Sequence, residues 1–316
     1  MKNIAKLIKL TLLVVSSTIM FSCSDDDSTT SSTNSISDVA SRNSDLSILV
    51  DALEKTDLLS VLGQNGSYTV FAPTNSAFNN FLDENNLNSL DEVPVGLLRE
   101  VLLNHVVVGA NLSSNLRTGY VKTLGKGNAS STNTLSMYIN TSDGVRLNGV
   151  SSVIIANIGA SNGVIHVVDA VIGLPTVVTH ALANPSFSSL VGALTSSGQP
   201  DFVGILSGSA NSPFTVFAPS NDAFATFESQ NPGTLGSLTS SQLTSILSYH
   251  VVAGANVLSN EIPSGPITTF ESGTFTISGT TITDEASRQT NIVAVDVQAA
   301  NGVIHVINNI ILPELN

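Results

Sequence analysis

The stretch TVFAPTNSAF at residues 69–78 decides the fold, because it returns with two changes as TVFAPSNDAF at residues 215–224. Two further blocks follow each copy in the same order: NHVVVGAN at 104–111 with YHVVAGAN at 249–256, and NGVIHVVD at 162–169 with NGVIHVIN at 301–308. A repeat of about 140 residues is a whole domain rather than a solenoid unit. The sequence therefore predicts two tandem domains of the same fold, in which loops changed length while the blocks did not.

The boundary between the two copies falls near Leu174 and Pro175. We assign residues 36–174 to the first domain and residues 175–316 to the second. Both lengths are ordinary for a globular domain.

Each copy begins with a helical pattern. Apolar residues at i, i+3, i+4 and i+7 predict one buried helical stripe in each copy: Leu46, Leu49, Val50 and Leu53, and then Phe187, Leu190, Val191 and Leu194. In the second copy Asn184 is the expected N-cap and Pro185 fits the first helical turn.

The repeated TVFAP segment predicts a short buried strand that ends at a proline. Asn75 and Asn221 are expected to cap the short helix that follows it. Leu97, Leu98, Val101 and Leu102 mark a later helix, whose counterpart opens with the capping-box pair Thr239 and Gln242 and buries Leu243, Ile246 and Leu247.

From about residue 120, and again from about 266, apolar and polar residues alternate as in strands. Asp143-Gly144 and Ser278-Gly279 are expected hairpin turns. Helices first and strands later place each copy in the α+β class.

The first 22 residues predict a secretory signal peptide. Three lysines precede an apolar run from Leu10 to Met20, which is shorter than the ~20 residues that a membrane-spanning helix needs. Without this segment the chain keeps 8 basic and 24 acidic residues. Because such a field repels phosphate backbones, nucleic acid is not an expected partner.

Cys23 is the only cysteine of the chain, so no intramolecular disulfide can form. The residues around it resemble a lipoprotein signal of the Bacteroidota type, which implies lipidation of Cys23. The following Ser24, Asp25, Asp26 and Asp27 resemble a surface-export signal, with a solvated spacer as the alternative. Residues 23–35 are then a flexible polar tether, and the chain is expected to be an outer-membrane lipoprotein exposed at the cell surface.

The three repeated blocks resemble those of the fasciclin-like (FAS1) family, over about residues 36–316. The resemblance implies a wedge of β-strands flanked by several helices, no cofactor, and a role in adhesion or extracellular binding. Tyr249 and His250 match the family's tyrosine-histidine motif, which makes them, with His105, a candidate binding motif. The first copy departs from that motif, because Asn104 stands where the tyrosine is expected.

Four of the five histidines recur as the pairs His105 with His250 and His166 with His305. An acid–base role would need such groups near a substrate, but the apolar residues around His166 favour a structural one. His180 has no counterpart and is expected at the surface or between the domains. The sequence carries no metal-ligand spacing and no Gly-x-Ser-x-Gly elbow, so we expect neither a metal site nor an enzyme.

Three functions stay open from the sequence. The first is a lipid-anchored adhesion or binding protein with an extracellular protein or glycan ligand. The second is an accessory glycan-binding protein in nutrient capture, although the absence of Trp and the presence of only four Tyr weaken a stacking platform. The third is a structural component of the envelope that associates with itself.

Overall fold

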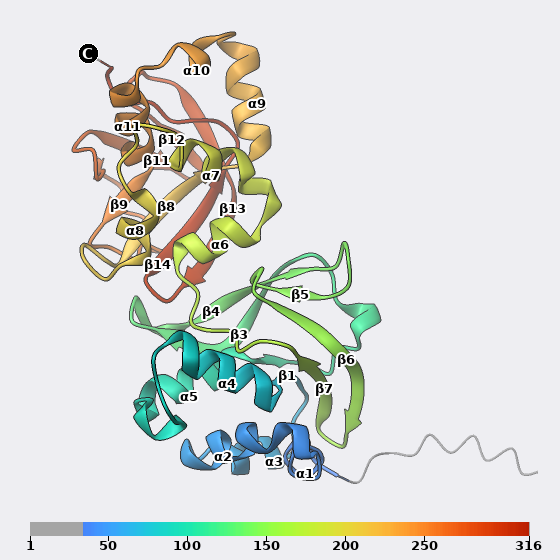
Figure 1. The fold of residues 1–316 in the computed structure, drawn as a ribbon. Helices are drawn as coiled ribbons and strands as arrows, with labels where there is room; N and C mark the ends of the chain where they lie inside the picture. The colour runs from blue at the N-terminus through green and yellow to red at the C-terminus, as the bar shows by residue number, and fades with distance from the viewer. Residues whose placement is uncertain (1–33, 316) are drawn as a thin grey trace, which may run out of the picture. The chain divides into compact units, whose positions relative to one another are not determined.

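The computed structural model describes residues 34–315. Each half contains seven strands and begins with short helices; its first strand is followed by further helices, and the other strands come after them (Figure 1). Helices early and strands late in each copy agree with the expected α+β class. The first half consists of α1 (Ile36–Ser41), η1 (Ser44–Leu46), α2 (Ser47–Lys55), α3 (Leu59–Gly63), β1 (Tyr68–Pro73), α4 (Asn75–Glu84), η2 (Leu90–Glu92), α5 (Val95–Asn104), β2 (Val106–Val108), η3 (Ser113–Asn115), β3 (Gly119–Gly127), β4 (Ser130–Asn140), β5 (Arg146–Leu147), β6 (Ser151–Ala160) and β7 (Gly163–Val168).

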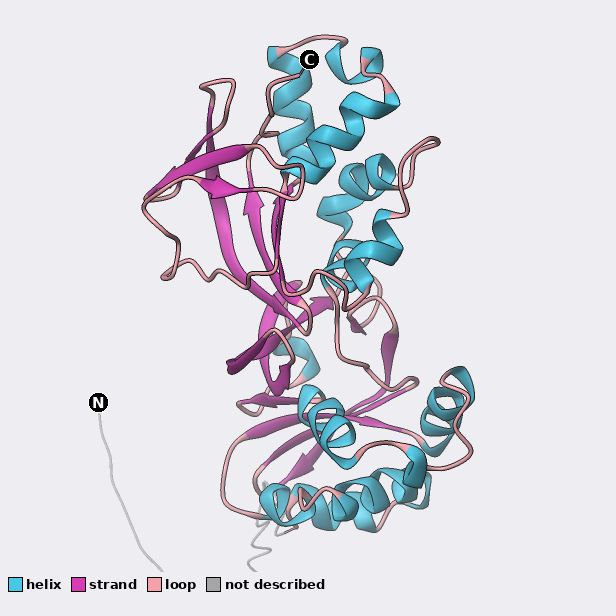
Figure 2. Cartoon of the chain, turned by 90° about the vertical axis from the view of Figure 1, so that its left-hand side faces the viewer, coloured by secondary structure: helices cyan, strands magenta, loops and turns pink. Residues whose placement is uncertain are grey.

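The second half repeats this order. It consists of α6 (Val177–Ala183), η4 (Pro185–Phe187), α7 (Ser188–Leu194), α8 (Phe202–Ser207), β8 (Phe214–Pro219), α9 (Asn221–Gln230), α10 (Thr234–Ser237), α11 (Ser240–Tyr249), β9 (Val251–Ala253), β10 (Ile267–Thr268), β11 (Thr274–Ser278), β12 (Thr281–Thr283), β13 (Gln289–Ala299) and β14 (Gly302–Ile307). Figure 2 shows the helices of this half gathered on one side of its strands.

The repeated blocks supply three adjacent strands in each half, in the order β7, β1, β2 in the first and β14, β8, β9 in the second. β1 runs parallel to β7, with Phe71 opposite His166. β8 runs parallel to β14 in the same way, with Phe217 opposite His305. The other strand pairs are antiparallel. In the first half a pairing of β2 with β3 closes the sheet into a barrel, whereas the second half keeps an open seven-stranded sheet.

The predicted helical stripes form part of the core. Leu46, Leu49 and Leu53 are buried against the strands of the first half, and Phe187 and Leu190 are buried in the second. Leu97 is the exception, because it lies on the outer face of α5 and is exposed. Pro185 starts a short 3₁₀ helix that Asn184 caps, and Thr239 and Gln242 form the predicted capping box of α11.

The caps after the repeated strand differ from the prediction. Thr74 and Ser220 are the N-cap residues of α4 and α9, and their hydroxyls accept from Ala77 N and Ala223 N. Asn75 and Asn221 sit one residue later, so capping by these asparagines was wrong. Both residue types favour N-caps, and only the backbone geometry separates two adjacent candidates.

Asn34 and Ser35 belong to the fold rather than to the predicted tether. The Asn34 carbonyl accepts from Ser161 N, and Ser35 forms a capping box with Asp38 at the start of α1. Within residues 34–315 no helix has the length and apolar character needed to cross a membrane.

Candidate functional site

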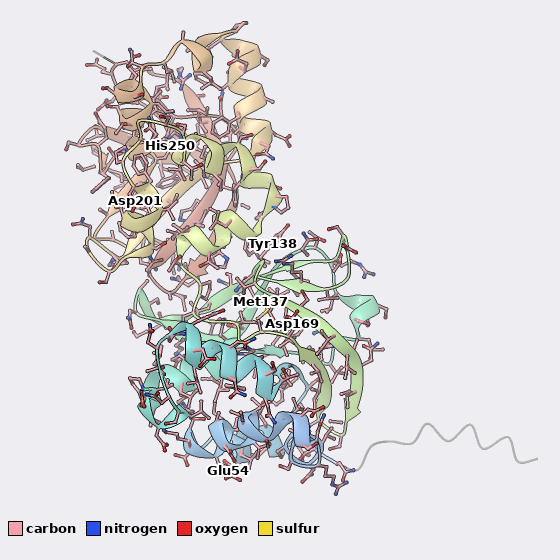
Figure 3. All side chains as sticks on the ribbon, viewed as in Figure 1. Glu54, Met137, Tyr138, Asp169, Asp201 and His250 are labelled. Carbon is pink, nitrogen blue, oxygen red and sulfur yellow. The ribbon has the colours of Figure 1, made fainter. Side chains whose placement is uncertain are left out.

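The histidines at the ends of α5 and α11 hold the chain segment that leaves each sheet. His105 Nδ1 donates to Val101 O at 2.7 Å, and its Nε2 accepts from Ile172 N at 2.9 Å. His250 repeats this with Ile246 O at 2.7 Å and Ile311 N at 3.2 Å. Each ring therefore ties the last helical turn to the segment that follows the final strand. Figure 3 labels His250 in the interior of the second domain.

Burial sets the charge of these two histidines. It lowers the pKa of His105 and of His250 to about 4, and the bond to the helix carbonyl offsets this only in part. A neutral ring can donate from Nδ1 and accept at Nε2. Both bonds therefore require the neutral form, which the low pKa maintains near neutral pH.

Tyr249 is fully buried beside His250. Its hydroxyl donates to Thr274 O at 2.6 Å and accepts from Glu285 N at 3.2 Å, and burial raises its pKa. Because both side chains are enclosed, neither can touch a partner in this conformation. A binding role for Tyr249, His250 and His105 stays a prediction that needs this region to open.

Asn104 replaces the tyrosine with a different set of bonds. Its Nδ2 donates to Gly173 O at 3.0 Å and Ile172 O at 3.4 Å, and its Oδ1 accepts from the Thr123 hydroxyl at 3.1 Å. The two carbonyls belong to the connector to the second domain. The departure from the motif therefore anchors the connector between the two domains.

His166 and His305 stack on the phenylalanine of the repeated strand, with ring centroids 5.6 Å and 5.4 Å apart. His166 Nε2 donates to Asn111 O, and its Nδ1 accepts from Asn157 N. His305 Nε2 donates to Val257 O, but its Nδ1 has no partner among the described residues. Burial lowers the pKa of both rings. Through these hydrogen bonds His166 holds the loop that follows β2, and His305 holds the loop that follows β9.

Asn75 and Asn221 fasten α4 and α9 to the preceding helices. Asn75 Oδ1 accepts from Ile48 N at 2.9 Å and its Nδ2 donates to Ser44 O. Asn221 makes the equivalent bonds to Ser189 N and Pro185 O. Their contacts join helix to helix, in place of the capping that the sequence suggested.

A repeated bulge is the feature that the sequence reasoning missed. The pairing register shifts in β6 and β13, where Asn157 and Asp296 have left-handed backbones with φ of 65° and 61°. Asn157 binds the backbone and hydroxyl of Ser113, and Asp296 binds those of Ser259. Asparagine and aspartate tolerate this backbone region better than other side chains.

Both bulges expose aliphatic side chains, and Ile154 and Val293 lie at equivalent positions before Asn157 and Asp296. Ile154 and Ile155 are 54% and 53% exposed, and Val293 and Val295 are 59% and 44% exposed. Both lie in apolar runs that are typical of buried strands. In the sequence, the only sign of each bulge is the asparagine or aspartate at the end of the run, because these residue types tolerate the left-handed region.

His180 lies between the two halves and is fully buried. Its ring meets the Tyr120 ring edge-on, with the ring centroids 5.4 Å apart. Of the two expected locations, the surface or the region between the domains, the structure shows the latter. Burial lowers its pKa to about 4, with the Gln298 backbone opposing the shift. Neither ring nitrogen reaches hydrogen-bond geometry within the described residues.

The described residues contain no group of three or more His, Cys, Asp or Glu side chains placed to hold a metal ion. Cys23, Ser24, Asp25, Asp26 and Asp27 lie outside the described residues, so lipidation and surface export stay predictions from the sequence.

Comparison with known proteins identifies the repeated unit. Residues 44–175 and 185–313 each match the fasciclin domain. The chain is 38% identical over 146 residues to Protein sll1483 of Synechocystis. The aligned region covers 44% of this chain and 74% of that protein. It is 27% identical over 296 residues to a fasciclin-like arabinogalactan protein of Arthroderma benhamiae, across 88% of this chain and 66% of that protein.

A solved structure shares the tandem arrangement. It is a FAS1 domain pair from the insect cell adhesion molecule fasciclin I, with a TM-score of 0.50 and 23% identity. The match covers 85% of this chain and 92% of that one. The expected wedge of strands flanked by short helices, present twice, is confirmed.

Proposed function

The chain belongs to the fasciclin domain family, and we propose that it is a lipid-anchored protein of the outer membrane that binds an extracellular protein ligand at the cell surface. The observation that carries the proposal is the pair of complete fasciclin domains, which make up nearly all of the described chain. A related domain pair comes from a cell adhesion molecule.

The N-terminal sequence supports the anchor. A signal-like segment ends at the single cysteine, and an acidic run and a polar stretch follow it. Lipidation there would consume a thiol that is otherwise a liability outside the cell. A second attachment signal, such as a basic patch, is not needed where several acyl chains share one cysteine, because each buried methylene adds about 0.8 kcal/mol.

The surface supports a protein ligand over a glycan. Each domain presents two aliphatic side chains on a bulge that a serine contact fixes in place. Apolar side chains on a rigid support suit the centre of a protein interface. Two such places on one tether would add avidity if both engage.

The proposal assigns no catalytic role. All five histidines are buried, and four of them hold backbone groups. An acid or base that is enclosed and already bonded to its own backbone is poorly placed to act on a substrate.

A binding screen tests the function. Soluble residues 24–316, and each half where it folds alone, would be applied to arrays of matrix proteins and glycans. We expect saturable protein binding that falls at least tenfold when Ile154 and Val293 are replaced by serine. The matched control is Leu182→Ser, which removes an equally exposed aliphatic side chain elsewhere.

Each other result has a defined meaning. Binding only to glycans would favour the nutrient-capture function, and it would contradict the protein ligand. A mass that rises with concentration, without any ligand, would favour the self-associating envelope component. Protein binding that survives both bulge substitutions would place the contact surface elsewhere.

A further inference from the structure

The first domain contains a cavity of about 240 Å³ beneath the loop of residues 109–118. Its inner wall is apolar and includes Phe71, Val107 and Ile139. Its solvent-facing edge carries Asn115, Arg117 and Thr118, all of which are exposed. Small-molecule sites commonly combine apolar walls with a few polar groups, and they often lie at the mouth of a barrel.

The strand pair beside the cavity carries smaller side chains than the corresponding pair of the second sheet. Val121 pairs with Met137 where Ile267 pairs with Phe275 in the second sheet. Phe275 packs edge-on against Phe217 at 5.0 Å and Tyr249 at 5.9 Å. The first domain has Met137 and Asn104 in place of Phe275 and Tyr249. Phe71, the counterpart of Phe217, lines the cavity. Met137 is labelled in Figure 3 on the strand β4.

Arg117 gives this edge its charge. Its Nη1 donates to Ser114 O at 2.6 Å and Leu116 O at 2.9 Å, which fixes the guanidinium on the loop. The ion pairs among residues 34–315 are Lys55 with Asp91 and Arg288 with Asp284. No carboxylate of the described chain therefore pairs with Arg117, and its remaining N–H groups can bind a planar anion.

The loop over the cavity is held before any ligand arrives. The Thr69 hydroxyl donates to Gly109 O at 2.6 Å and accepts from Asn111 N. His166 binds Asn111 O, and Asn157 binds Ser113. A site whose walls are already ordered loses less entropy on binding.

We propose that this cavity binds a small amphipathic carboxylate, with the apolar part against Phe71 and Val121 and the carboxylate on Arg117. The volume corresponds to about eight water molecules at ~30 Å³ each. It therefore suits a ligand of about eight non-hydrogen atoms. A single cation and an apolar wall favour one carboxylate over a phosphate or a sugar.

The test is calorimetric titration of residues 24–316 with hexanoate, beside its neutral analogue hexanamide. Weak saturable binding of hexanoate is expected, with Kd on the order of 1 mM for so small a ligand. Arg117→Gln should weaken hexanoate at least tenfold and leave hexanamide unchanged. Arg146→Gln, which removes another exposed arginine of the same domain, should leave both unchanged.

Two further variants introduce the larger side chains of the second domain, at Val121 in the cavity wall and at Met137, which pairs with it. Val121→Ile and Met137→Phe should each weaken both ligands, and thermal unfolding would verify the fold. Val121→Ile is the smaller change and decides the matter if Met137→Phe does not fold. The absence of saturable hexanoate binding up to about 20 mM, twentyfold above the expected Kd, would overturn the proposal. Binding that Arg117→Gln or Val121→Ile leaves unchanged would overturn it as well.

Discussion

At the scale of single residues, the first domain has Asn104 where the second has Tyr249. Tyrosine fills the second core and binds its neighbouring strand. Asparagine is too short to do so, and it binds the connector carbonyls instead. The sequence identified the substitution, but it gave no indication of the new partners, because these lie 68 and 69 residues away.

Asn104→Ala should destabilise the first domain by about 2–4 kcal/mol, since it leaves the Ile172 and Gly173 carbonyls without their donor and removes one bond of the Thr123 hydroxyl. Urea unfolding of residues 24–316 measures this loss. Asn115→Ala is the matched control, because Asn115 is exposed and should cost less than about 0.5 kcal/mol. Equal costs for the two substitutions would contradict the anchoring role.

The buried histidines predict a pH dependence. Burial lowers the pKa of His105, His180 and His250 from 6.5 to about 4, so the unfolded chain binds more protons between these values. The stability that comes from keeping these histidines neutral is therefore fully present above pH 6.5 and is lost as the pH falls toward 4. Each such histidine contributes a slope of up to about 1.4 kcal/mol per pH unit in this window.

His250→Gln should reduce that slope by up to about 1.4 kcal/mol per pH unit, which corresponds to one proton fewer taken up on unfolding, whatever it does to stability at pH 7. Denaturant unfolding at several pH values between 4 and 7 gives the slope. An unchanged slope would mean that His250 is protonated in the folded chain, which would break its bond to Ile311 N.

At the scale of elements, alternation and helical spacing were reliable guides to type and order. They failed at two local features. The helix caps shifted by one residue from Asn75 to Thr74, and the runs ending at Asn157 and Asp296 formed exposed bulges instead of flat strands. Both features depend on backbone angles at single residues, which periodicity does not report.

Thr74→Ala should cost about 1 kcal/mol, because the hydroxyl that accepts from Ala77 N is lost. Thr74→Ser should cost much less, since the second domain uses Ser220 in the same way. Thermal unfolding of the two variants compares them directly. Equal destabilisation would show that the threonine methyl group, rather than the cap, is what matters.

At the scale of the whole molecule, the repeat allowed the fold and the tandem organisation to be predicted, because three spaced blocks occur in both copies. The candidate sites were harder to predict. Val121 lines the cavity and pairs with Met137. Both are unremarkable as strand residues, and they differ from their counterparts in the second copy mainly in size. The contacts between the halves also join residues that no motif connects, such as Tyr120 with His180.

Gly127 should be essential for the contact between the halves. A side chain there would meet the backbone of Ala300 at 2.2 Å, close to where Ala129 N donates to Ala300 O. Gly127→Val should therefore speed hydrogen exchange at Ala129. Gly159→Ala has open space and is the control, and protection at Ala129 that survives Gly127→Val would contradict the packing.

The central claim is that two fasciclin domains bind an extracellular ligand from a lipid anchor on Cys23. Its most direct test is adhesion of bacteria that produce the full chain, or its Cys23→Ala variant, to surfaces coated with the ligands from the binding screen. The account predicts adhesion above that of empty cells for the native chain, and none for Cys23→Ala, whose protein should be released. Equal adhesion by both strains, or adhesion by neither, would contradict it.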